Sequence, residues 1–362
     1  MRKVLLRIVF DQLWHFQSVG NELLVGYGWA IVAWALIAAI GLAILWKLTR
    51  DRQQVTSSLF FWGVIPAAIA MVPVLNLPIV HTGIPIFGYG FMMFVGFSSG
   101  TLLASRRAQT VGLNSEVVWD LMMWLLIPGI IGARIVYLMQ NYDRVLGGKS
   151  GMELIKSAVA LWDGGIVFYG CIIGGVLGLV VFCRRNGIPP LQLADVVMPS
   201  LFLGLGFGRI GCFLYGCCYG GECSLPWAVQ FPSDSMTYEA LSQRGPEFLS
   251  ADGLRTIPLH PTQIYSSILA FILGGILAWF FRRRPFEGAV FALGWILYPI
   301  NRFVLEIIRN DEPDRLGTGL TFSQLMSLGL FLSGAGLMLY LQQKGAKGTG
   351  SAKEAATDTP AG

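Results

Sequence analysis

Three arginines lie within or at the edge of long apolar stretches of the chain. Arg134 lies in GIIGARIVYL, Arg209 in LFLGLGFGRIGCFLYG and Arg302 in LGWILYPINRFVLEIIRND. A guanidinium surrounded by hydrocarbon costs at least about 2.5–3.5 kcal/mol, so such a residue is usually paired or functional. For any one of them, extension of the side chain to the membrane surface is the simpler interpretation. Three on separate segments favour a binding site for an anion.

The segment around Arg302 carries further polar residues at helical spacing. Arg302, Glu306 and Arg309 are separated by four and three residues, so a helix places them on one face, where they can pair. Tyr298 lies one turn before Arg302 and can add its hydroxyl to this group. A glutamate that orients a buried arginine suits a phosphate clamp. An equal alternative is that the ion pair only holds neighbouring helices together.

Histidine is scarce, with only His15, His81 and His260 in the chain. His260 lies in LHPTQIY, where Pro261 marks the first turn of a helix. An imidazole at this place can act as a general base or as a donor to phosphate. A helix cap or an interfacial residue is the alternative.

Four of the six cysteines are concentrated in the segment GCFLYGCCYGGEC. They are Cys212, Cys217, Cys218 and Cys223. In an oxidising compartment, local disulfides or free structural thiols are the first expectation, ahead of a catalytic thiol. A metal site is disfavoured because paired C-x-x-C motifs are absent. The sequence therefore predicts no metal and no cofactor.

The composition indicates what kind of protein holds these residues. Of its 362 residues, 54% are hydrophobic and 13% charged, against about 25% charged in soluble domains. Apolar runs long enough to cross a bilayer recur along the whole chain. They predict an all-α polytopic membrane protein with about nine transmembrane helices, at 23–46, 58–80, 85–105, 116–139, 164–183, 191–213, 262–281, 287–308 and 321–342. The net charge of +5 gives no indication of nucleic-acid binding.

Basic residues predict the orientation of these spans. Loops rich in arginine or lysine follow alternate spans, and the positive-inside rule places them in the cytoplasm. The longest loop, 214–261, then faces the outer side, as do the ends of the spans that carry the three arginines. Before the first span, MRKVLLRIVFDQLWHF is expected to form an interfacial amphipathic helix, with a tenth span as the alternative. The polar tail 343–362 is expected to be disordered and cytoplasmic.

Glycines at four-residue spacing predict close packing between helices. Gly170, Gly174 and Gly178 occur in YGCIIGGVLG. Small residues at this spacing let two membrane helices approach until their backbones touch. We therefore interpret them as packing residues.

Several motifs, taken in order, resemble those of prolipoprotein diacylglyceryl transferases. They are GYGFMMFVGF, GARIVYL, WDGGIVFYGCIIGG, GLGFGRIGCFLYGCCYG, HPTQIY and EGAVFALGWILYPINRFVLEIIR. The resemblance covers residues 83–342 and implies a seven-helix core with an active site open to the outer leaflet. Residues 1–82 then form an N-terminal extension with about two spans.

The resemblance also implies a reaction and its site residues. The reaction is transfer of a diacylglyceryl group from phosphatidylglycerol to the lipobox cysteine of prolipoprotein signal peptides, at the periplasmic face of the bacterial inner membrane. Arg209 and Arg302 match the family's two essential arginines. The implied catalytic residues are Arg209, Arg302, Tyr169 and His260. The implied substrate-binding residues are Arg134, Tyr89, Tyr298, Glu306 and Gly220.

The chain departs from the family pattern at positions that matter for the chemistry. Tyr169 stands where many members have histidine, and Cys212, Tyr215 and Cys217 stand where asparagine, asparagine and glutamate are usual. A phenol, with an ordinary pKa of about 10, is a weak base unless an arginine favours its phenolate. His260, or no protein base at all, is the alternative to Tyr169.

The altered signature leaves other functions open. A related membrane transferase that acts on another lipid or acceptor is one alternative. A lipid or anion transporter is another, but transporters usually show internal repeats, and no matching halves are visible in this sequence.

Overall fold

The computed structural model describes residues 4–10, 12–14, 16–19, 22–49, 67, 69–73, 83–160, 165, 167–309 and 320–357. The chain divides into two compact units. The first is Met1–Phe94 with Gly208–Ile264, and the second is Val95–Phe207 with Tyr265–Gly362. Each unit is described by itself.

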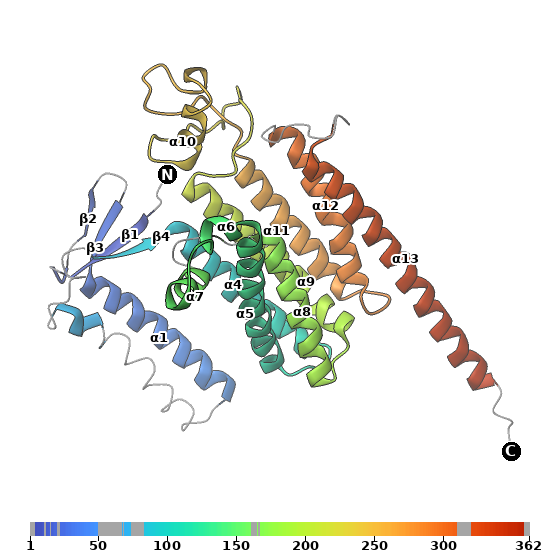
Figure 1. Cartoon of the computed structure of the whole chain (residues 1–362). Coiled ribbons are helices and arrows are strands. Elements are labelled where there is room, and N and C mark those ends of the chain that lie inside the picture. The colour runs from blue at the N-terminus through green and yellow to red at the C-terminus, as the bar shows by residue number, and fades with distance from the viewer. Residues whose placement is uncertain are drawn as a thin grey trace. The chain divides into compact units, whose positions relative to one another are not determined.

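Helices make up most of the described chain (Figure 1). The long ones are α1 (Tyr27–Thr49), α4 (Gly88–Gln109), α5 (Ser115–Gln140), α8 (Phe168–Asn186), α9 (Pro190–Tyr215), α11 (Thr262–Phe281), α12 (Ala289–Arg309) and α13 (Phe322–Thr357). The short ones are α6 (Tyr142–Val145), α7 (Gly151–Val159), α10 (Met236–Ser242) and the 3-10 helix η2 (Pro246–Phe248).

The long helices agree well with the expected spans. Each of the seven spans expected between residues 85 and 342 coincides with one helix from α4 to α13. Within the described ranges, α5, α9, α11, α12 and 323–344 of α13 are long and apolar enough to cross a membrane. The protein is therefore a multi-pass membrane protein. The expected span 58–80 lies largely outside the described residues, and α13 continues to Thr357 through residues whose composition predicted disorder.

The expectation of an all-α chain, with an amphipathic helix at its start, is wrong for the N-terminal part. A four-stranded sheet with the order β2-β3-β1-β4 forms there instead. Its strands are β1 (Val4–Val9), β2 (Phe16–Val19), β3 (Glu22–Gly26) and β4 (Ile84–Phe87). β1 lies in the middle, parallel to β3 and antiparallel to β4, and Arg7 Nε donates to Glu22 Oε2 at 2.8 Å. In the sheet, the backbone N–H and C=O groups of β1 form hydrogen bonds with a strand on each side. In a helix, the same groups would form hydrogen bonds within the segment itself.

The hydrophobic core of the second unit is built from α4, α5, α8, α9, α11 and α12. Leu121, Leu193, Leu277 and Val290 are completely buried in it. At its edge the buried carboxylate of Asp195 accepts the backbone N–H groups of Gly288 at 2.8 Å and Phe291 at 2.9 Å. Because these N–H groups lie at the start of α12, where helical partners are missing, Asp195 fixes that helix to α9.

The glycines of α8 pack against α5, as the sequence predicted. A Cβ atom at Gly174 would meet the carbonyl oxygen of Pro128, and one at Gly178 would meet that of Trp124. Pro128 has no N–H to donate to the Trp124 carbonyl four residues earlier, so this carbonyl turns toward the neighbouring helix without loss of a regular bond. Close approach of two backbones is what small residues at this spacing provide.

This packing gives a prediction with an internal control. Gly174→Ala is expected to destabilise the protein by about 1–3 kcal/mol, the usual cost of forcing an extra methyl into a packed interface. Gly175→Ala, one residue along the same helix, meets nothing within 4 Å and should leave stability unchanged. Thermal unfolding of both variants in detergent measures the difference. Equal stability of the two would contradict the close packing of α8 on α5.

Candidate active site

Arg209 lies on α9, two turns before the helix ends at Tyr215. It is partly buried and makes no hydrogen bond or ion pair with any residue that the structure describes. The positive charge of Arg209 interacts electrostatically with the phenol of Tyr89 and with the thiol of Cys212. A membrane-helix arginine whose donors are all available is suited to binding an anionic group.

Three thiols gather immediately after Arg209. The sulfur atoms of Cys212, Cys217 and Cys218 all lie within 4.8 Å of one another. Hydrogen bonding with the Cys212 thiol, and then with Cys218, raises the pKa of the Cys217 thiol above its ordinary value. None of the six cysteines, all of which the structure describes, is in a disulfide, so the local disulfides considered from the sequence are not formed.

The loop that carries these thiols is fixed to the start of α11 by side chains. Thr262 Oγ1 donates to the carbonyl of Cys218 at 2.9 Å, and Gln263 Nε2 donates to that of Cys217 at 2.6 Å. Both donors are almost completely buried. These two contacts therefore fix the loop to the first residues of α11.

Gly220 and His260 belong to the same junction. The N–H of Gly220 donates to the carbonyl of His260 at 3.0 Å, and the N–H of His260 donates to that of Gly221 at 2.9 Å. A Cβ at Gly220 would lie 2.6 Å from Thr262 Cγ2 and 2.8 Å from His260 Cβ. Gly220 is thus required for close approach of the two segments, and His260 is positioned through its backbone.

Tyr89 lies at the start of α4 and faces the end of α9. Its ring meets that of Tyr215 edge-on, with 6.4 Å between centroids. A Cβ at Gly211 would lie 3.0 Å from the ring of Tyr89. Tyr89 and Arg209 are therefore brought together in the first unit.

Arg302 and Glu306 form the ion pair that their spacing predicted. Arg302 Nη1 lies 2.6 Å from Glu306 Oε2, and the glutamate side chain is completely buried. Arg302 Nη2 also donates to Ser323 Oγ on α13, at 3.0 Å. Figure 1 shows α12 and α13 side by side, and this contact joins them. The arginine is thereby oriented from two sides, while 18% of its side chain stays accessible.

Tyr298 does not join this pair. Its ring packs edge-on against Phe202, with 6.4 Å between centroids, as part of the core. Within the described part of the chain its hydroxyl makes no hydrogen bond.

Arg134 has a different environment from the other two arginines. It is 8% exposed and donates to the carbonyls of Ser157 at 2.7 Å, Ala158 at 2.8 Å and Gly165 at 3.0 Å. Its guanidinium also lies over the ring of Tyr137, 5.1 Å from the centroid. Arg134 therefore ties the end of α7 and the segment after it to α5. Tyr169 occupies the first turn of α8, and its side chain lies outside the described part of the structure.

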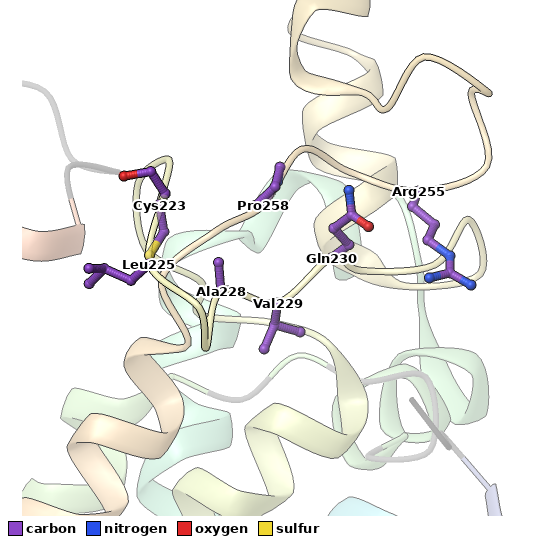
Figure 2. A pocket seen from close by; sticks show the side chains of 8 residues that line it. Cys223, Leu225, Ala228, Val229, Gln230, Arg255 and Pro258 are labelled. Carbon is purple, nitrogen blue, oxygen red and sulfur yellow. The ribbon is translucent and has the colours of Figure 1, made fainter.

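A shallow pocket opens in the long loop between α9 and α11. Its volume is about 560 Å³. Figure 2 shows Cys223 and Leu225 on one side of it and Gln230 with Arg255 on the other. Within this loop, Phe231, Leu241 and Leu259 form a small hydrophobic cluster, which gives the loop a core of its own.

Some contributors were not visible in the sequence. Thr262, Gln263 and Ser323 are ordinary polar residues, and only their contacts show that they hold the cysteine loop and Arg302. The sole sequence signal was their position at the start of an apolar helix, where polar residues commonly cap.

Comparison with known proteins identifies the family of this chain. A family model described as prolipoprotein diacylglyceryl transferase matches residues 78–340. "Phosphatidylglycerol--prolipoprotein diacylglyceryl transferase 2" of Clostridium perfringens is 37% identical over 74% of this chain and 96% of its own length. The enzyme of that name from Clostridium tetani is 34% identical over 68% and 89%. That of Rhodopirellula baltica is 27% identical over 90% and 87%. The chain belongs to the prolipoprotein diacylglyceryl transferase family.

Proposed function

We propose that this chain transfers the diacylglyceryl group of phosphatidylglycerol to the lipobox cysteine of prolipoprotein signal peptides. Family membership supports this proposal, because the relatives are named as phosphatidylglycerol–prolipoprotein diacylglyceryl transferases. The observation that carries the proposal is Arg209, a partly buried arginine on a membrane helix with no hydrogen bond or ion pair among the described residues. Phosphatidylglycerol presents the phosphate that such an arginine binds.

The reaction sets definite requirements for the site. The acceptor thiol gives up its proton, and the thiolate attacks the glyceryl carbon next to the phosphate. A carbon–sulfur bond forms, the carbon–oxygen bond to phosphate breaks, and glycerol phosphate leaves with the negative charge. Arginines that are oriented before the reaction stabilise this growing charge without reorganisation. Arg209 and Arg302 take this role, and Glu306 with Ser323 keeps Arg302 in position.

The remaining site residues have supporting roles in this proposal. Tyr89 lies beside Arg209, while Gly220 and Arg134 hold segments of the backbone in place. Tyr169 is the first candidate for the base that receives the thiol proton, and His260 is the second. A third route uses no protein base, because the positive potential of the arginines favours the thiolate in the substrate itself.

The membrane topology belongs to the same proposal. We place about nine spans in the bacterial inner membrane, with the basic loops in the cytoplasm. The loop 214–261 and the active site then face the periplasm. On that side the enzyme meets the lipobox of an exported prolipoprotein as it leaves the membrane.

Replacement of a bacterium's own transferase by this chain tests the function. A reporter lipoprotein is isolated and its lipobox peptide is examined by mass spectrometry. The expected result is a diacylglyceryl thioether on the lipobox cysteine, with Arg209→Gln as the inactive control. An unmodified reporter, in cells whose membranes contain the folded chain, would refute the proposal.

A further inference from the structure

The cysteines after Arg209 differ from the other cysteines of the chain in their surroundings. Cys183 and Cys223 are 1% and 3% exposed, as small apolar residues in a core usually are. Cys212, Cys217 and Cys218 are only partly buried. Packing therefore explains the first two but not the group of three.

A specific backbone conformation brings these three thiols together. The N–H groups of Gly216 and Cys217 both donate to the carbonyl of Cys212, at 2.9 and 3.1 Å, so the chain turns back directly after α9. Gly216 has φ of +76°, and Cys218 has φ of +60°. A left-handed conformation is strained for cysteine and persists only where its surroundings impose it. Here Thr262 and Gln263 impose it through the two cysteine carbonyls.

The distances suit metal coordination. Thiolate binds zinc at about 2.3 Å, which places the sulfurs of a tetrahedral site about 3.8 Å apart. The three sulfurs here lie within 4.8 Å of one another. A shift of about 1 Å closes the gap, and rotation of the side chains supplies it while the backbone stays fixed.

Charge explains why these thiols gain from a cation. Three thiolates within 4.8 Å of one another repel one another strongly unless a positive charge lies between them. A bound metal ion reverses the balance, because it deprotonates coordinating thiols outright. Arg209 adds one further positive charge near Cys212.

We propose that Cys212, Cys217 and Cys218 form a three-thiolate site for a soft metal ion of the Cu(I) class. Soft thiolates select Cu(I) and zinc among the common metals. Zinc in structural sites takes four protein ligands, whereas the group that the described residues bring together has three. Binding forms three metal–sulfur bonds and releases the three thiol protons to the buffer, and the copper stays Cu(I). This departs from the sequence-based expectation of no metal.

Titration with Cu(I) tests the site in the full-length chain, purified in detergent with a reductant and without oxygen. The Cu(I) complex of bicinchoninate is the probe, since its colour fades as the protein removes copper. We expect the chain to remove one equivalent. The variant with all three cysteines replaced by serine should remove none, and each single replacement should weaken binding about tenfold or more. Cys171→Ser, an exposed cysteine of α8 outside the group, is the matched control.

X-ray absorption at the copper edge gives an independent measurement, and it should show three sulfur neighbours. Equal copper uptake by the wild type and the triple variant would overturn the proposal, as would nitrogen or oxygen neighbours alone. It would also fail if two of the three cysteines are found joined as a disulfide and the reduced chain still binds no copper. Should the triple variant not fold, Cys212→Ser and Cys217→Ser alone decide. No lipid or peptide substrate is present, so the result is independent of the transferase activity.

Discussion

Arg209→Lys is expected to lower the rate of diacylglyceryl transfer by about 100- to 1,000-fold, the loss typical of one preorganised donor to a developing anion. Lysine keeps the positive charge but offers a compact ammonium instead of a planar fork. It therefore loses the paired contact that a guanidinium makes with two phosphate oxygens. Because Arg209 makes no hydrogen bond or ion pair with the described residues, its replacement should leave the folded protein almost as stable as before.

The measurement is transfer of radiolabelled diacylglyceryl from phosphatidylglycerol to a lipobox peptide in detergent. Arg106→Lys is the matched control, because Arg106 is exposed at the end of α4 and should keep full activity. Thermal unfolding of both variants separates a loss of chemistry from a loss of structure. If Arg209→Lys retains more than about a tenth of the wild-type activity, Arg209 is not a phosphate ligand whose loss lowers the rate 100-fold or more.

Local sequence patterns were sufficient to predict the helices of the core. The seven long helices between α4 and α13 coincide with apolar runs, and nothing distant in sequence has to be known to recognise such runs. The N-terminal sheet differs in this respect. β1 is stabilised by β4, which lies about eighty residues further along the chain. The sequence of a short apolar segment does not show whether its backbone will form a helix or will form hydrogen bonds with such a distant strand.

The same distinction applies to the site. Arg302 and Glu306 are one helical turn apart, so their pairing followed from spacing alone. Arg134 looked similar in sequence, yet it is bound by carbonyls of residues 157, 158 and 165, which no pattern connects to it. The cysteine group is intermediate. Its members are close in sequence, but they converge only because the chain reverses at Gly216 and is held there by α11.

The pair Arg302 and Glu306 allows stability and catalysis to be separated. Glu306→Gln leaves the arginine charge without its carboxylate, and breaking a buried pair costs about 3–5 kcal/mol. We expect the lower end, about 3 kcal/mol, because 18% of the Arg302 side chain is accessible and partly screened by solvent. Transfer activity should fall about 10- to 100-fold, since Arg302 loses the partner that orients it. Glu153→Gln, an exposed glutamate of α7, is the control and should change neither quantity.

The double variant with Arg302→Met and Glu306→Leu then decides what the pair is for. Replacing both charges of a buried pair by apolar side chains of similar size is often neutral or stabilising. Most of the stability lost in Glu306→Gln should therefore return in the double variant, as measured by unfolding in detergent. Activity should not return if Arg302 binds the phosphate as proposed, because methionine cannot take its place. Recovery of both would mean that the pair only joins α12 to its surroundings, and that Arg302 does not act on the phosphate.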